Sequence, residues 1–210
     1  YCVGCGAEGA YLCPACRPAL ASSAPSCPVC GRRNFDGVLC GSCAEVAALR
    51  RFLAPFSYRD PLVRELIHTY KYDRVRELAA LFADEIARFL RVYAIQPPRE
   101  ALLVPVPLHR SRERERGFNQ SSLLAAEIGE RLGVAVAPAL RRRRATESQV
   151  SLASFAQRRA NVAGAFAVAD AAAVADRTAI LIDDVSTAGA TLGEAARVLR
   201  EAGARTVWAI

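Results

Sequence analysis

The stretch AILIDDVSTAGATL, residues 179–192, decides the fold. An apolar run ends at two adjacent acids, Asp183 and Asp184, and a loop of small and hydroxylated residues follows. A short, continuous apolar run is typical of a buried strand in a parallel sheet, where ligands bind at the carboxyl ends of the strands. We therefore expect both carboxylates at the rim of a sheet, beside the start of a helix.

The loop after the acids has the composition of an anion-binding turn. Gly189 can adopt a positive φ, and Thr187 and Thr191 carry hydroxyl groups that can form hydrogen bonds. Backbone amides at a helix start favour phosphate, and paired carboxylates can accept hydrogen bonds from a sugar diol. The segment therefore predicts a site for a ribose 5-phosphate. The alternative interpretation of the acids is a helix N-cap with a solvated neighbour.

Outward from this stretch, strands alternate with helices. The pattern predicts helices at about 61–72, with Asp60 as N-cap, and at 74–93, 121–133, 151–160 and 191–202. It predicts strands at about 101–106, 134–137, 164–168, 178–182 and 206–210, with an irregular stretch at 138–150. This alternation predicts an α/β fold in which helices flank a mostly parallel sheet.

All eight cysteines form C-x-x-C pairs within the first 43 residues. The pairs are Cys2 and Cys5, Cys13 and Cys16, Cys27 and Cys30, and Cys40 and Cys43. Two such knuckles supply the four thiolates of a tetrahedral zinc site, so we expect two structural Zn²⁺ ions. Sequential pairing of the knuckles is favoured over cross-braced pairing because it closes shorter loops. Disulfides and a redox motif are the alternatives, but nothing signals export and a redox pair occurs singly.

The charge pattern favours a phosphate-rich partner. The formal charge of +7 falls to about +3 once thiolates and zinc ions are counted, so local patches matter more than the net value. Arginines concentrate in RSRERER (110–116) and RRRR (141–144), of which the second reads more readily as a solvated basic run. No apolar run is long enough for membrane insertion and no export signal is visible, so we expect a cytoplasmic protein. Since Tyr1 is not methionine and Ile210 falls inside an expected strand, we expect both ends to continue in a longer chain.

The stretch ILIDDVSTAGAT (180–191) closely resembles the phosphoribosyl-pyrophosphate (PRPP) motif of type I phosphoribosyltransferases. The wider chain resembles the ComF family of competence and DNA-utilisation proteins, which join a cysteine-rich zinc ribbon to a phosphoribosyltransferase-like domain. Besides the four knuckles and the PRPP motif, the matching stretches are IHTYKYDRVRELA (67–79), VPVPLHRSRERERGFNQSSLLA (104–125) and RATESQVSLASFAQRRANVAGAF (144–166). The resemblance implies a double zinc ribbon at 1–47 and a phosphoribosyltransferase-like domain at 52–210.

The resemblance also implies roles for individual residues. Asp183 and Asp184 match the catalytic acids that bind the ribose hydroxyls. The PRPP-binding loop corresponds to Val185, Ser186, Thr187, Ala188, Gly189, Ala190 and Thr191, with Thr-Ala-Gly where the family usually has Thr-Thr-Gly. Arg112, Arg114 and Arg116 lie where the superfamily places its pyrophosphate loop and lid, and a guanidinium suits pyrophosphate. The alternative for these arginines is a solvated loop.

Three functions follow from these features. The first is a PRPP-dependent phosphoribosyltransferase, in which Mg²⁺ and arginines stabilise departing pyrophosphate and the product serves DNA uptake or nucleobase salvage. The second is a noncatalytic factor that handles single-stranded DNA, with a competence helicase as an expected partner. The third is a PRPP sensor that docks partners through its zinc ribbons. His68 and His109 read as ordinary histidines, and Lys71 matches a family lysine to which the sequence assigns no role.

Overall fold

The apolar run before the acid pair is the central strand of a parallel sheet in the computed structural model of this chain. The structure describes residues 1–210 except 21, 28, 45–47, 147–153 and 187–188. Within the described residues, the main sheet has five strands in the order β1-β7-β6-β2-β3, all paired in parallel. These strands are β1 (Arg51–Phe52), β2 (Leu102–Pro105), β3 (Ala135–Val136), β6 (Thr178–Ile182) and β7 (Thr206–Ala209).

Burial of both faces of the sheet explains the unbroken apolar sequence of β6, whose five residues are all buried. Successive side chains of a strand point to opposite faces. Ile180 and Ile182 accordingly belong to one hydrophobic cluster, and Ala179 and Leu181 belong to another. The sheet thus separates two apolar layers.

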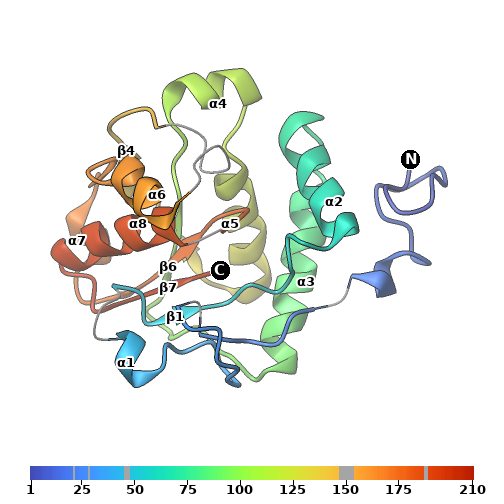
Figure 1. Ribbon diagram of the computed structural model, residues 1–210. Helices are drawn as coiled ribbons and strands as arrows, with labels where there is room; N and C mark the ends of the chain where they lie inside the picture. The colour runs from blue at the N-terminus through green and yellow to red at the C-terminus, as the bar shows by residue number, and fades with distance from the viewer. Residues whose placement is uncertain (21, 28, 45–47, 147–153, 187–188) are drawn as a thin grey trace.

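Helices cover both layers (Figure 1). The layer of Ile180 includes buried residues of α2 (Pro61–Tyr72), α3 (Leu78–Val92) and α5 (Gln120–Leu132). The layer of Leu181 includes buried residues of α8 (Ala190–Glu201). The predicted α/β class, a parallel sheet flanked by helices, is confirmed. In the part of the chain that the structure describes, no helix combines the length and apolarity needed to cross a bilayer.

Local signals set the ends of these helices. The Asp60 side chain accepts hydrogen bonds from the amides of Leu62 and Val63 at 2.8 and 3.2 Å, so the predicted N-cap is confirmed. Gly133 ends α5 with a φ of +64°, as its position predicts. The prediction that the next helix starts at Arg74 is wrong, because Arg74 has a φ of +59° and α3 begins at Leu78.

The chain from Pro138 to Val168 departs further from the prediction. The expected irregular stretch contains β4 (Leu140–Arg142), which pairs antiparallel with β5 (Phe166–Val168). The strand predicted at 164–168 therefore exists but lies in a separate two-stranded sheet. The sequence does not reveal β4 because a run of arginines lacks the β-branched and aromatic residues that indicate strands.

Three short helices complete this half of the molecule. RSRERER forms α4 (Arg110–Arg116), which the His109 side chain caps and Gly117 ends with a φ of +80°, so this segment is not a loop. α6 (Phe155–Val162) begins with a capping box at Ser154, later than the predicted start at 151, and residues 151–153 lie outside the described chain. α7 (Ala171–Val174) is not predicted by the sequence.

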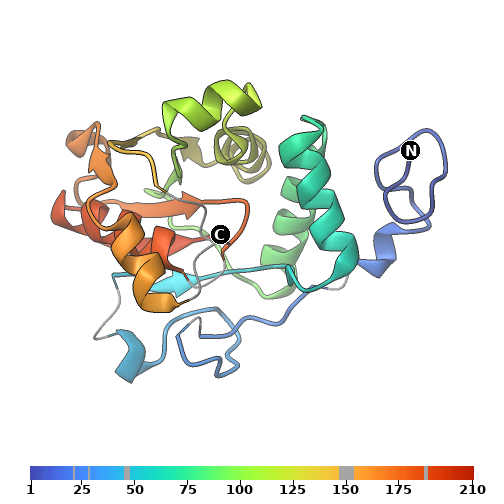
Figure 2. The ribbon, with the colours of Figure 1, turned by 45° about the horizontal axis from the view of Figure 1, so that its top comes forward.

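The first 44 residues run along two different parts of the core (Figure 2). They contain only short helices among the described residues, η1 (Arg17–Ala19) and α1 (Gly41–Ala44). Cys2, Leu12 and Leu20 belong to the hydrophobic layer of α2 and α3. Cys27 and Leu39 belong to the layer of α8. The two halves of the cysteine-rich segment are therefore attached to opposite faces of the sheet.

Candidate functional site

The acid pair lies directly after β6, at the sheet edge that the sequence predicts. Oδ1 of Asp183 accepts hydrogen bonds from Ser121 Oγ at 3.1 Å and from the Asp184 amide at 3.0 Å. Oδ1 of Asp184 lies 2.8 Å from Nζ of Lys71. Among the residues that the structure describes, neither Oδ2 has a partner. One oxygen of each carboxylate is therefore held, and the other can accept hydrogen bonds.

The two carboxylates share a partly desolvated environment. Burial and, to a smaller extent, the charge of Asp184 raise the pKa of Asp183, Lys71 acts in the opposite direction, and the net result is a pKa of about 7. Near neutral pH the pair therefore carries less than two full negative charges. A site of this kind suits hydrogen bonding to hydroxyl groups.

Lys71 reaches the acid pair from the last turn of α2. The preceding residue, Tyr70, is fully buried, and its hydroxyl donates a 2.7 Å hydrogen bond to the carbonyl of Gln120 on α5. Thr69 is also buried. These contacts fix the end of α2 against α5, so the lysine starts from a rigid backbone. Lys71 matches a family lysine, but the sequence assigns it no role. Its partner, Asp184, becomes visible only in the fold.

The start of α8 faces the same pocket as the acids. Gly189 is its N-cap with a φ of +69°, and as a glycine it offers no side chain to cap the helix. The first amides of a helix need a hydrogen-bond acceptor that the helix cannot supply, and they favour an anion. Ala190 and Thr191 line the pocket together with Val185 and Ser186. Of the predicted phosphate loop, Thr187 and Ala188 lie outside the described residues.

This pocket has a volume of about 180 Å³ and gathers cations opposite the acids. Of the arginines that the sequence predicts, Arg112 and Arg116 line it, each reaching down from α4. Arg112 donates to the carbonyl of Thr146 at 3.0 Å, and Arg116 donates to Gln120 Oε1 at 3.1 Å. Arg114 is not brought to the acids, because it lines a separate hollow on the outer side of α4.

Arg142 is a pocket residue that the sequence analysis missed. In β4 the side chains alternate, so Leu140 is buried, Arg141 is exposed and Arg142 turns inward. Its guanidinium donates to Thr146 Oγ1 and lies 5.3 Å from the centre of the Phe166 ring, and its buried Nε has no partner among the described residues. Burial lowers its pKa, and the nearby charge of Arg112 adds to this effect. Arg142 could have been predicted as a pocket residue only if the arginine run had been predicted as a strand, in which alternate side chains point inward.

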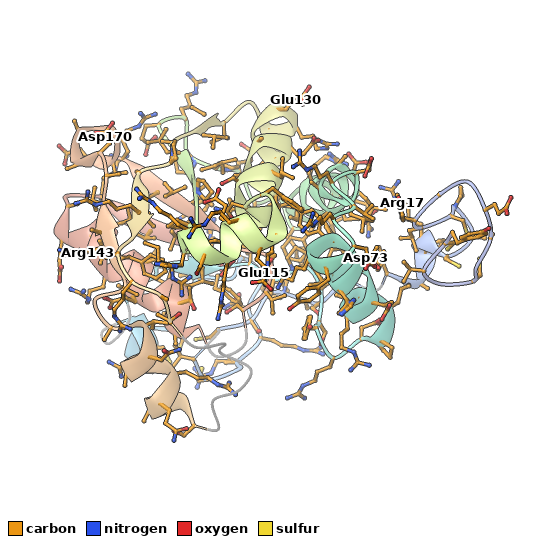
Figure 3. The ribbon with its side chains drawn as sticks, turned by 90° about the horizontal axis from the view of Figure 1, so that it is seen from above. Arg17, Asp73, Glu115, Glu130, Arg143 and Asp170 are labelled. Atoms are coloured by element: carbon orange, nitrogen blue, oxygen red, sulfur yellow. The ribbon has the colours of Figure 1, made fainter. Side chains whose placement is uncertain are left out.

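Aromatic side chains stand at the mouth of the pocket. Tyr72 is 58% exposed, its ring lies 4.7 Å from that of His68, and the guanidinium of Arg116 lies 5.5 Å from its centre. Arg74 joins this end of α2 to α4 through a 2.7 Å hydrogen bond to the carbonyl of Glu115. Figure 3, a view from above, shows α4 with Glu115 beside the end of α2 with Asp73. Among the described residues, neither histidine forms a hydrogen bond or ion pair with the acid pair: the His68 ring contacts that of Tyr72 at a tilt of 43°, and His109 caps α4.

The cysteines form two clusters of four. Cys2, Cys5, Cys13 and Cys16 make the first, and Cys27, Cys30, Cys40 and Cys43 make the second. Within each cluster all sulfur atoms lie within 4.8 Å of one another, which confirms the sequential grouping of the knuckles. The backbone amide of Cys13 lowers the pKa of the Cys2 thiol to about 6, which favours the thiolate that zinc binds. Each cluster could hold one zinc ion, and four cysteine ligands close the coordination sphere of a structural site.

Known proteins from several bacteria are similar to this chain over most of its length. The chain is 33% identical over 202 residues to the DNA utilization protein YhgH of Salmonella typhimurium, covering 93% of this chain and 87% of the relative. It is 30% identical over 208 residues to the competence protein ComFC of Bacillus subtilis, covering 91% and 79%. It is 29% identical over 204 residues to the competence protein F of Haemophilus influenzae, covering 93% and 87%. No family model matches the chain. The extent and level of these similarities show that the chain belongs to the ComF family of competence and DNA-utilisation proteins.

Proposed function

We propose that the pocket after β6 binds the ribose 5-phosphate part of PRPP or of a phosphoribosylated nucleotide. The observation that supports this is the acid pair: neither Oδ2 of Asp183 or Asp184 has a partner among the described residues. Both acids line one pocket with the start of α8, whose N-cap Gly189 has no side chain. Two adjacent hydroxyls of a ribose match the two oxygens. A 5′-phosphate matches the helix amides near Gly189.

The arginines extend this proposal to PRPP. Arg112, Arg116 and Arg142 line the same pocket, and guanidinium groups bind phosphate oxygens through paired hydrogen bonds. In a phosphoribosyl transfer, the bond from ribose C1 to pyrophosphate breaks and a bond from C1 to a base nitrogen forms. Positive charge around the departing pyrophosphate would stabilise that step, and Mg²⁺ would accompany the diphosphate. Within the ComF family such a reaction would serve DNA uptake or reuse of nucleobases.

The binding proposal is tested by comparing ribose 5-phosphate with 2-deoxyribose 5-phosphate by isothermal titration calorimetry. We expect the deoxy sugar to bind at least about 100-fold more weakly, because carboxylate oxygens arranged for a diol lose one donor. Asp184→Asn should weaken binding of the ribose compound, whereas Glu65→Gln, the same change on the exposed side of α2, should not. Equal affinity for both sugars would overturn the proposal.

Turnover is tested separately, by following pyrophosphate release from PRPP with a panel of bases. Release that depends on a base and disappears in Asp184→Asn would support a phosphoribosyltransferase. PRPP binding without release for any base would support a sensor that docks partners through its zinc ribbons.

The exposed ring of Tyr72 favours a second function, the handling of single-stranded DNA. Single-strand binding proteins stack bases on aromatic rings and hold the backbone with cations. The Tyr72 ring contacts that of His68 and lies near the guanidinium of Arg116. Exposed arginines surround it on α4 and in and after β4, namely Arg110, Arg114, Arg141 and Arg143. Binding of a fluorescent oligonucleotide should then weaken steeply between about 50 and 200 mM salt, and Tyr72→Ala should weaken it at constant salt. Unchanged binding in Tyr72→Ala would contradict this function.

A further inference from the structure

The cationic residues of this chain are almost all arginine. The sequence has 27 arginines and a single lysine, Lys71. On an exposed surface either residue supplies a positive charge. They differ where space and geometry are restricted, because an ammonium is a compact point charge and a guanidinium is a wide planar fork. The one position that keeps lysine is the one that contacts the acid pair.

The contact between Lys71 and Asp184 is enclosed. The Nζ–Oδ1 distance is 2.8 Å, and the side chains are only 15% and 11% exposed, so water screens the pair less than a surface ion pair. Tyr70, anchored on Gln120, holds the helix backbone in place. The lysine occupies Oδ1 of Asp184, as Ser121 occupies Oδ1 of Asp183, and neither Oδ2 has a partner among the described residues.

The charges around the pocket supply a second observation. Its described lining contains four cationic side chains, Lys71, Arg112, Arg116 and Arg142, and two carboxylates, Asp183 and Asp184. The acid pair therefore already has a neutralising cation, and the three arginines remain for the diphosphate of PRPP. A divalent metal is a common way to neutralise such a site. Here the side chain of Lys71 supplies a positive charge next to the acid pair.

We propose that Lys71 is the resident cation of the ribose site, and that it allows a ribose 5-phosphate to bind without a divalent metal ion. This inference rests on the proposed function. Lys71 acts through Asp184 and is a positioning residue: it neutralises this carboxylate and fixes the direction of its second oxygen. Magnesium that accompanies PRPP would then belong to the diphosphate and not to the sugar.

The test uses ribose 5-phosphate, which lacks a diphosphate that could bring magnesium with it. Its affinity is measured by calorimetry with magnesium omitted and with magnesium added; chelators are avoided because they would attack the cysteine clusters. We expect the wild type to bind equally under both conditions. Lys71→Met should raise the dissociation constant at least about tenfold without magnesium, and added magnesium should restore part of this loss. Arg64→Met, which removes an exposed charge from the same helix, should match the wild type.

Lys71→Arg separates charge from shape. It retains the positive charge, so it should bind without magnesium more tightly than Lys71→Met. If Lys71→Met does not fold, the wild-type protein still gives an answer, because Lys71 carries the only side-chain amine. Ribose 5-phosphate should slow the acetylation of Lys71, as measured by peptide mass spectrometry, and protein acetylated there should need magnesium for binding.

Two failures can be told apart. A wild type that binds ribose 5-phosphate only with magnesium, or a folded Lys71→Met variant that binds as the wild type does, would overturn the role of Lys71 alone. A wild type that binds neither ribose 5-phosphate nor PRPP under any condition would overturn the proposed function and this inference with it.

Discussion

Asp183 is the residue whose environment has the clearest consequence for stability. Burial raises its pKa to about 7, well above that of an aspartate in the unfolded chain. Between these two pKa values the folded protein holds a proton that the unfolded chain has lost. The free energy of unfolding therefore decreases as the pH rises toward 7, and the cost of the buried charge is fully present above that pH.

We predict that Asp183→Asn removes this pH dependence. The asparagine can still accept the hydrogen bond from Ser121, but it carries no charge. Relative to the wild type, the variant should gain stability from about pH 6 to about pH 8.5, by on the order of 1 kcal/mol, because only about one pH unit of this window lies below the folded-state pKa. Urea denaturation at both pH values measures the difference. A constant difference between the two proteins would show that Asp183 is ionised in the folded state throughout.

Arg141 and Arg142 offer a test at adjacent positions. Arg142 lines the pocket and Arg141 is exposed on the other side of β4. Arg142→Gln should weaken PRPP binding by roughly 1.5–3 kcal/mol, as expected for loss of a charged hydrogen bond, and Arg141→Gln should leave it nearly unchanged. Calorimetry with PRPP measures both. Equal effects would mean that the arginine run acts only through its total charge.

At the scale of elements, the sequence predicts the helices and strands that have a local sequence signal. It does not predict a strand that forms only because it pairs with another strand. Asp60, Gly133 and the apolar run of β6 carry their structural signals in a few neighbouring residues, so the helix ends and the acid-bearing edge were predictable. β4 exists because it pairs with β5, and its own residues do not indicate a strand. Arg142 was missed for this reason. Lys71 was missed as a site residue because its partner lies 113 positions away in the sequence.

Two helical glycines should respond oppositely to alanine. A Cβ atom at Gly129 of α5 would lie 2.8 Å from the carbonyl oxygen of Val134 and 2.9 Å from Cγ2 of Val136, whereas one at Gly193 of α8 would meet nothing within 4 Å. Alanine is favoured over glycine inside helices by about 1 kcal/mol. Gly193→Ala should therefore raise the melting temperature, and Gly129→Ala should lower it because α5 packs closely on the turn that leads into β3. A higher melting temperature for both variants would show that the turn after α5 moves to make room for the added Cβ atom.

At the scale of the whole molecule, the two cysteine clusters should bind metal independently. They are separate in space and belong to opposite apolar layers. The purified protein should contain about two zinc ions per chain, and either Cys5→Ser or Cys30→Ser should reduce this to about one. Elemental analysis gives the ratio. Loss of both ions from a single substitution would indicate that the clusters depend on each other.

The attachment of the first 44 residues to both faces of the sheet has a consequence for biosynthesis. Cys2 and Leu12 share a layer with residues of α3, and Cys27 and Leu39 share one with Val207 of β7, which the ribosome makes about 170 positions later. Both cysteine clusters can take up metal while translation continues, but the apolar layer that holds the second cluster is complete only after β7 emerges. Contacts this distant along the chain are typical of slow folding. A nascent chain with loaded knuckles and an unfinished sheet would therefore be the species most exposed to aggregation and proteolysis.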